Sequence, residues 1–245
     1  MKPPFPFRIR PEPIVNGHSQ IIAYEIITKL PYPYPNMAKL LSILETHHKN
    51  QLIECLNTAI IQNSITLNLN PKYIWYNMPP NCLADTNFLK NFMEIIEFQK
   101  KSHQTGIEIT ENSRKYVDIA KIGKIIELFK DKSLTVIMDD FGTGHNSLHL
   151  LTRYPWDIVK IDGKLINNLK KSQNEQTQKR TRTILKKIIE AIREVEIVTL
   201  AEWIEEKYQY EILKNYGCHL FQGYLFTKKQ RVWREITKQK PGKGA

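Results

Sequence analysis

The chain has 245 residues, of which 41% are hydrophobic, and 36 Lys and Arg against 25 Asp and Glu give it a formal net charge of +11. No apolar run approaches the roughly 20 residues that a membrane span requires, and residues 1–10 are proline-rich and basic, unlike a secretion signal. The three widely spaced cysteines, Cys55, Cys82 and Cys218, fit neither a disulfide framework nor a zinc knuckle, so we expect a cytoplasmic protein with reduced thiols.

Eight of the thirteen prolines lie in the first 35 residues. Because proline lacks an amide donor and restricts the residue before it, we expect an extended segment over residues 3–13 and a loop over residues 31–35. Between them, residues 19–25 predict a short strand. Residues 37–61 carry apolar side chains at helical spacing and predict one or two helices.

The rest of the chain alternates short β-branched or aromatic runs with longer helical patterns. The predicted strands are residues 72–78, 106–109, 134–138, 157–161, 196–200 and 218–221, and the predicted helices are residues 88–99, 117–129, 147–153, 180–195 and 207–215. This alternation is typical of parallel β-α-β units. No linker or break in composition divides the chain, so we expect a single α/β barrel domain over residues 1–245, with a core of about residues 8–236 and a basic tail at 237–245.

A polar side chain lies at the end of nearly every predicted strand. These side chains are Glu25, Asn77, Glu108, Asp139, Asp140, Lys160, Asp162 and Glu202. In a closed barrel, residues at successive strand ends converge on one rim, where such barrels carry their sites. A single acid in this position commonly caps the next helix, but capping does not account for five or six acids at the same rim.

Converging carboxylates require compensation, because two like charges about 4 Å apart repel by about 4 kcal/mol at an effective dielectric constant of about 20. Ligation by carboxylates and an Asn carbonyl suits Mg²⁺ or Mn²⁺. The consecutive Asp139 and Asp140 allow one side chain to bridge two ions while the other binds one, and two-metal sites hydrolyse phosphodiesters. Lys160, the lone cation among these acids, is predicted to polarise the attacking water or to offset charge in the transition state.

Eight segments occur in order along nearly the whole chain: PIV beginning at Pro13, YEIITKL, YNMPPNCL, IEITEN, MDDFGTGHNSL, DIVKIDGKLI, LAEWIEE and GCHLFQGYLF. In this order they resemble the motifs of the EAL domain family of cyclic di-GMP phosphodiesterases. The resemblance implies a TIM-like (β/α)8 barrel with an antiparallel first strand. It also implies a stand-alone, homodimeric domain that uses two Mg²⁺ or Mn²⁺ ions to cleave cyclic di-GMP to linear pGpG.

The resemblance implies a role for each matching residue. Glu25, Asn77, Glu108 and Asp139 match the ligands of one metal, and Asp139, Asp140 and Glu202 match those of the second. Lys160 matches the lysine that contacts the catalytic water, and Ile27, Lys29, Asp162, Glu205 and Gln222 match substrate-binding or supporting positions. Asn68 is an alternative to Asn77, but we prefer Asn77 because Leu83 follows it at the spacing typical of the family.

Three residues depart from the family pattern. Ile26 replaces a small residue of the signature, Lys29 replaces an arginine that binds phosphate through two hydrogen bonds, and Trp203 replaces a glycine. Two functions therefore stay open: an active phosphodiesterase, and a weak or inactive EAL domain that acts as a cyclic di-GMP receptor or a protein-binding regulator. We favour the enzyme because its set of acids, Asn and Lys is complete.

Two basic segments raise a third possibility, direct binding of nucleic acid. Residues 170–193 hold eight cations against two acids, and residues 228–243 hold seven cations against one. Neither segment interleaves aromatic side chains with its charges, as binders of single strands do. We therefore interpret them as a solvated helix face and a tail.

Overall fold

The computed structural model describes residues 7–29, 73–78, 86–99, 104–109, 119–142, 148–170, 173–227 and 234–236. The strands within these residues are β1 (Phe7–Asn16), β2 (Ile21–Lys29), β3 (Tyr73–Met78), β4 (Gln104–Ile109), β5 (Thr135–Phe141), β6 (Ile158–Ile161), β7 (Val198–Ala201), β8 (Leu220–Gln222) and β9 (Arg234–Ile236). The helices are α4 (Thr86–Gln99), α5 (Ile119–Asp131), α6 (Leu148–Arg153), α7 (Gly163–Asn167), α8 (Glu175–Glu194), α9 (Lys207–Asn215) and α10 (Tyr224–Thr227).

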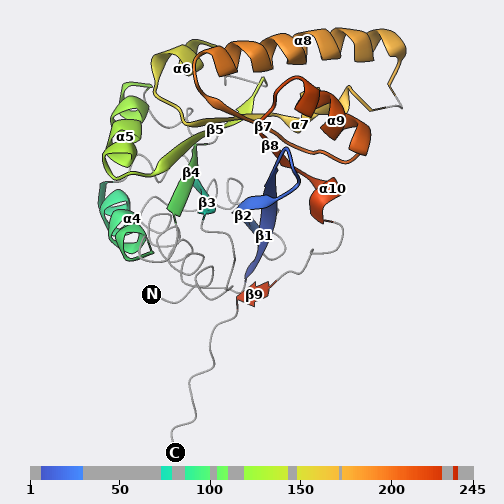
Figure 1. The fold of residues 1–245 in the computed structure, drawn as a ribbon. Coiled ribbons are helices and arrows are strands. Elements are labelled where there is room, and N and C mark those ends of the chain that lie inside the picture. The colour runs from blue at the N-terminus through green and yellow to red at the C-terminus, as the bar shows by residue number, and fades with distance from the viewer. Residues whose placement is uncertain are drawn as a thin grey trace, which may run out of the picture.

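Strands β1 to β8 close into a barrel. Each strand from β2 to β7 pairs in parallel with the next, and β1 closes the ring by pairing antiparallel with both β2 and β8. Short β9 adds to the outer end of β1 at Phe7, Arg8 and Ile9. The helices lie outside the strands (Figure 1). The predicted barrel with an antiparallel first strand is confirmed.

The proline-rich start forms the ten-residue strand β1. Pro11 and Pro13 pair with β2 on one side, whereas β8 pairs only with residues 14–16 and β9 only with residues 7–9. Proline is tolerated in a strand where one edge makes no ladder. Both prolines fall in the stretch that lacks a described partner on its second edge, so they do not interrupt the closed sheet.

The predicted elements agree with the structure apart from their ends. Strand β2 continues to Lys29, four residues beyond the predicted end, and α8 begins at Glu175, five residues before the predicted start. The side chain of Asn174 accepts a hydrogen bond from the Thr177 amide at 2.8 Å and so caps a polar first turn that helical periodicity does not reveal. The predicted loop at 31–35, the helices at 37–61, Asn68 and the tail at 237–245 lie outside the described residues.

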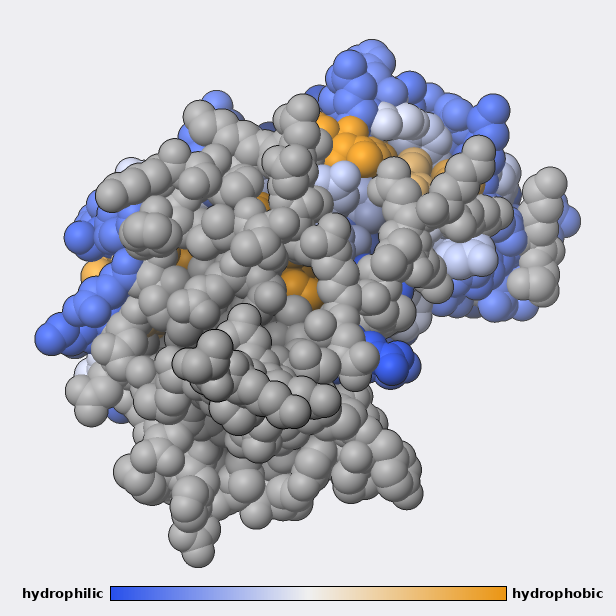
Figure 2. All heavy atoms as spheres, turned by 90° about the horizontal axis from the view of Figure 1, so that it is seen from below, coloured by the Kyte–Doolittle hydropathy of each residue, from blue (hydrophilic) through white to orange (hydrophobic). Residues whose placement is uncertain are grey.

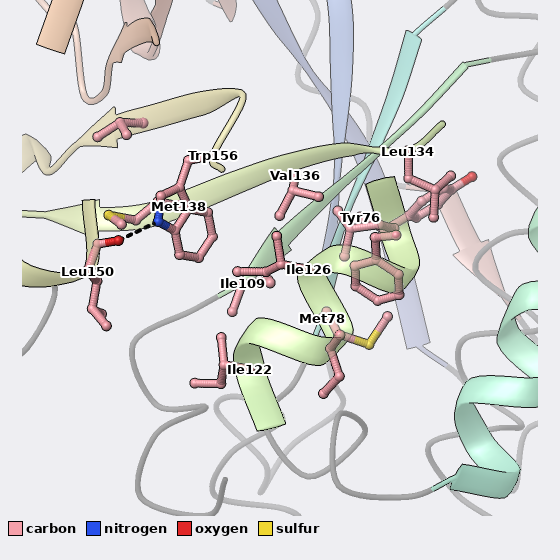
Figure 3. Close-up of a cluster of buried hydrophobic side chains, with 14 of the residues drawn as sticks. Tyr76, Met78, Ile109, Ile122, Ile126, Leu134, Val136, Met138, Leu150 and Trp156 are labelled. Atoms are coloured by element: carbon pink, nitrogen blue, oxygen red, sulfur yellow. Dashed lines mark hydrogen bonds between the residues drawn. The ribbon is translucent and has the colours of Figure 1, made fainter. Parts of the chain in front are cut away.

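The hydrophobic core has an outer part, between sheet and helices, and an inner part within the barrel. Figure 3 shows the outer part beside α5, where Ile122 and Ile126 of the helix meet Val136 and Met138 of β5. The indole nitrogen of Trp156 donates to the carbonyl of Leu150 at 2.9 Å, so this large side chain is buried without an unsatisfied donor. These contacts fix the strands that carry the polar rim.

The outer surface is mostly polar where the structure describes it. Figure 2, which views the molecule from below, shows hydrophilic side chains over most of the described part of that face, with smaller hydrophobic areas between them. On α8, Lys186 and Lys187 both pair with Glu190, as expected of a solvated helix face. No helix in the described part of the chain is long and apolar enough to cross a membrane.

Candidate functional site

The polar side chains of the site form one layer inside the barrel. The layer below them is apolar and consists of Ile14, Ala23, Trp75, Ile137, Ile158, Leu200 and Leu220. Side chains alternate between the two faces of a strand, so the residue two positions further along points into the barrel again. The residues reached in this way are Glu25 on β2, Asn77 on β3, Asp139 on β5, Lys160 on β6, Gln222 on β8 and Glu202, one residue beyond the end of β7.

Lys160 on β6 lies at the centre of this layer. Its Nζ is 2.6 Å from Glu108, 2.9 Å from Glu202 and 3.3 Å from both Glu25 and Asp139. Only 2% of the residue is exposed. Burial alone lowers the pKa of Lys160, but the surrounding carboxylates outweigh burial and hold its pKa well above the ordinary value. The side chain therefore keeps its positive charge among four acids.

Glu25 on β2 is held by three donors. It accepts hydrogen bonds from Asn77 Nδ2 and Gln222 Nε2, both at 2.6 Å, and from Lys160 Nζ at 3.3 Å. Burial by itself raises the pKa of Glu25, but the charge of Lys160 and the bonds from Gln222 and Asn77 bring the pKa below its ordinary value. Glu25 is thus held as a carboxylate in a fixed orientation.

Glu108 on β4 differs from Glu25 because only one of its oxygens is satisfied. Oε2 accepts from Lys160, while Oε1 is buried and has no hydrogen-bond partner within the described residues. Burial and the charges of Glu25 and Asp139 raise the pKa of Glu108 well above its usual value, against the opposing effect of Lys160. A buried carboxylate oxygen without a donor suits a bound cation.

Asp139 and Asp140 are consecutive, yet both carboxylates reach the same site. Regular alternation would send them to opposite faces of β5, but the pairing of β5 with β6 shifts register between Met138 and Phe141. At this bulge Asp140 takes a left-handed conformation with φ of 54°, which turns its side chain back. Burial, together with the charges of Asp139 and Asp162, raises the pKa of Asp140 to about 6.

Three acids lie close enough to share one cation. Carboxylate oxygens of Asp139, Asp140 and Glu202 all lie within 4.8 Å of one another. Burial is the main cause of a raised pKa at Glu202, where Asp139 and Glu25 add to the effect and Lys160 opposes it. Oxygen ligands at this separation suit one hard cation, and their role as the second metal site stays a prediction.

The remaining predicted site residues lie nearby in different settings. The Asp162 carboxylate caps α7 by accepting from the Lys164 amide at 2.5 Å, while Glu205 forms an exposed ion pair of 2.8 Å with Lys170. Ile27 is half-buried, and Lys29 is exposed at the end of β2. Substrate contact by these four residues stays a prediction, and so do the metal and catalytic roles of the polar layer.

Ile26 lies on the other side of the barrel wall from the site. It is 3% exposed and belongs to the outer core, together with Ile9 and Ile74. Because its neighbour Glu25 faces inward, Ile26 must face outward. Ile26 therefore does not line the polar layer, and its replacement of a small residue of the family signature affects the outer packing.

The site residues predicted from sequence do not include Arg10 and Glu12 of β1. Ile14 belongs to the inner core and Glu12 pairs in register with Glu25, so Glu12 and Arg10 follow Ile14 toward the rim. Arg10 donates to Glu12 at 2.5 Å. A search for acids at the carboxyl ends of strands cannot find them, because an antiparallel strand reaches the same rim with its amino end.

The EAL domain family matches residues 7–229 of the chain. The chain belongs to the EAL domain family. The relative named "Probable cyclic di-GMP phosphodiesterase PdeB", from Escherichia coli strain K12, is 29% identical over 167 residues, which cover 68% of this chain and 28% of that protein. The chain spans less than a third of the length of the first curated relatives that it matches.

Solved EAL structures share the fold. A stand-alone EAL protein from Vibrio cholerae O395 with cyclic di-GMP bound has a TM-score of 0.71 at 24% identity, covering 90% of this chain and 91% of that one. The manganese and cyclic di-GMP complex of Klebsiella pneumoniae BlrP1 also has a TM-score of 0.71, at 18% identity, covering 96% of this chain and 57% of that one. Both likenesses support the barrel described above.

Proposed function

We propose that this EAL domain is a metal-dependent phosphodiesterase that hydrolyses cyclic di-GMP to linear pGpG. The observation that carries the proposal is the buried layer of Glu25, Glu108, Asp139 and Glu202 around Lys160. A structural role alone does not explain so many buried acids, because each loses hydration and repels the others. The names of the family's relatives supply the substrate.

The residues fit two hard cations such as Mg²⁺ or Mn²⁺. Glu25, Asn77, Glu108 and Asp139 would hold one ion, and Asp139, Asp140 and Glu202 would hold the other. The ligand atoms are all oxygens, which hard cations prefer. One of them, Glu108 Oε1, is buried and accepts no hydrogen bond within the described part of the chain. Ions bound here would lower the pKa of a bridging water and offset charge on the phosphate.

The chain's own side chains prepare the site for an anionic substrate. Gln222 and Asn77 fix the orientation of Glu25 through their hydrogen bonds. Lys160 holds its proton on Nζ, and we assign to this ammonium the orientation of the attacking water and partial neutralisation of the transition state. The barrel wall excludes bulk water beneath this layer, which strengthens each of these interactions.

Turnover of cyclic di-GMP tests the proposal directly. We expect the purified chain to convert cyclic di-GMP to pGpG with Mn²⁺ or Mg²⁺, and we expect EDTA or replacement by Ca²⁺ to stop the reaction. Chromatographic separation of the two nucleotides measures the conversion. The proposal fails if no pGpG forms at high protein concentration in a buffer where a known EAL phosphodiesterase is active.

A second candidate function is that of a cyclic di-GMP receptor with little or no turnover. It draws support from the exposed Lys29 where the family has an arginine and from Trp203 where it has a glycine. Tight binding without pGpG formation would favour the receptor. Loss of the cellular effect in a folded Glu25→Ala or Asp139→Asn protein would favour the enzyme.

We further infer that the chain acts in the cytoplasm as a homodimer and forms one domain with a basic tail. The family resemblance carries this inference. Sedimentation velocity measures the mass in solution, and a monomer at micromolar concentration in the presence of substrate would overturn the dimer.

A further inference from the structure

Trp203 is a large apolar side chain that stays at the surface of the rim. It directly follows Glu202 after β7, and 47% of the residue is exposed. β6 and β7 pair in register at Ile161 and Ala201, so Glu202 lies level with Asp162 and Trp203 level with Gly163. Trp203 therefore directly follows the polar layer at the carboxyl ends of the strands, where barrels of this kind carry their sites.

The backbone at Trp203 is unfavourable for this residue type. Its φ is 53°, in the left-handed region that glycine adopts readily and that a bulky side chain rarely adopts. Burial does not compensate for the cost, because nearly half of the residue is exposed. Residues held in such conformations cluster at active sites and ligand sites.

The indole of Trp203 packs closely against Gly163. A Cβ atom added at Gly163 would lie 2.1 Å from Cγ and 2.3 Å from Cδ2 of Trp203, so the ring lies directly against the glycine backbone at the start of α7. Only a residue without a side chain leaves room for this contact. The ring is thus supported on one side and remains accessible on another.

We propose that Trp203 is a stacking surface for a guanine base of the dinucleotide bound at this rim. This inference rests on the proposed function, because it takes cyclic di-GMP as the ligand of the site. An indole that is held rigidly and partly exposed loses little freedom when a base stacks on it. The chain thereby gains a base contact where the family pattern has a glycine.

Binding of cyclic di-GMP in Ca²⁺ buffer, where the nucleotide stays intact, tests the proposal. We expect Trp203→Gly to weaken binding by about 10- to 100-fold and Trp203→Phe by no more than about threefold. The glycine variant suits its backbone conformation and is expected to stay folded. Cyclic di-GMP is also expected to quench indole emission in the native protein much more than in Trp203→Phe.

A second variant displaces the ring without removing it. Gly163→Ala is expected to weaken binding in the native protein, because its Cβ pushes the indole away, but to have little further effect in the Trp203→Gly background. Val195→Ser is the control, since Val195 is an exposed apolar residue before the opposite end of β7. The affinity of Val195→Ser for cyclic di-GMP is expected to equal that of the native protein.

The possible outcomes separate the two proposals. If the native protein binds cyclic di-GMP and Trp203→Gly binds it equally well, the stacking role is overturned while the proposed function stands. If the native protein neither binds nor hydrolyses the nucleotide, both are overturned. A loss in Trp203→Gly that Trp203→Phe restores, with quenching that depends on Trp203, supports the stacking role.

Discussion

The Nζ of Lys160 lies 2.6 Å from Oε2 of Glu108 inside the barrel, and the residues are 2% and 0% exposed. Glu25, Asp139 and Glu202 approach the same ammonium within 3.3 Å. One internal cation therefore holds four carboxylates together, which gives this lysine a structural role beside the catalytic role proposed for it. The two roles are separable by experiment.

Replacing Lys160 by Met is expected to destabilise the protein in EDTA. The substitution keeps most of the side-chain volume but leaves buried carboxylates without their cation, which costs about 3 to 5 kcal/mol. Added Mn²⁺ is expected to recover part of this loss while turnover stays low. Urea denaturation with and without Mn²⁺ measures both effects.

Lys187→Met on α8 is the matched control, because it removes a lysine whose only described ion pair, with Glu190, is on the surface. Exposed pairs contribute little to stability. An unchanged urea midpoint for Lys160→Met in EDTA would contradict the structural role of Lys160.

Glu25→Gln is expected to lower turnover by about 100-fold or more and to leave the fold intact. Gln has the same shape but lacks the negative charge that a cation requires. Asn77 and Gln222 donate to different oxygens of Glu25, so the amide nitrogen of the Gln would face one of these two donors. Turnover assays and Mn²⁺ titration calorimetry measure the loss. Glu190→Gln, at a surface acid of α8 paired with Lys187, provides the comparison. Equal Mn²⁺ affinity in Glu25→Gln and the native protein would argue against Glu25 as a ligand.

Asp140 gives the stability in EDTA a defined pH dependence. Burial, Asp139 and Asp162 raise its folded-state pKa from 3.8 to about 6. The folded protein therefore binds the Asp140 proton more tightly than the unfolded chain does. This proton stabilises the folded state fully below about pH 3.8, and the stabilisation is lost as the pH rises through 6. Asp140→Asn cannot titrate. We expect the free energy of unfolding of the native protein, minus that of Asp140→Asn, to fall as the pH rises from about 3.8 to about 6. A difference that stays constant or rises with pH would contradict the raised pKa of Asp140.

Gly106 lies in the inner core of the barrel and leaves no room for a side chain. A Cβ atom there would lie 2.5 Å from Trp75 Cδ1 and 2.9 Å from Ile137 Cδ1. Gly106→Ala is expected to cost about 1 to 3 kcal/mol, because a packed core must move to accept the methyl group. Thermal denaturation measures the loss. Gly17→Ala, whose Cβ would meet nothing nearer than 3.8 Å, is expected to be neutral, and equal melting temperatures for the two variants would contradict the prediction.

The regular parts of the site could be predicted from sequence. Glu25, Asn77 and Glu108 lie in or at the ends of recognisable strands, and a period of two places them on the same face as the inner core. Irregular parts could not be predicted in this way. A register shift brings Asp140 round beside Asp139, and an antiparallel strand brings Glu12 to the rim from the opposite direction.

The sequence by itself determined the barrel, the family and the identity of the polar residues, because hydrophobic periodicity and ordered motifs are local properties of the chain. Tertiary structure alone decided which charges meet. Only closure of the sheet brings Lys160 among acids from four other strands, and only the packing at the rim places Trp203 against Gly163. Those relationships depend on distances between segments far apart in the chain, which no local pattern encodes.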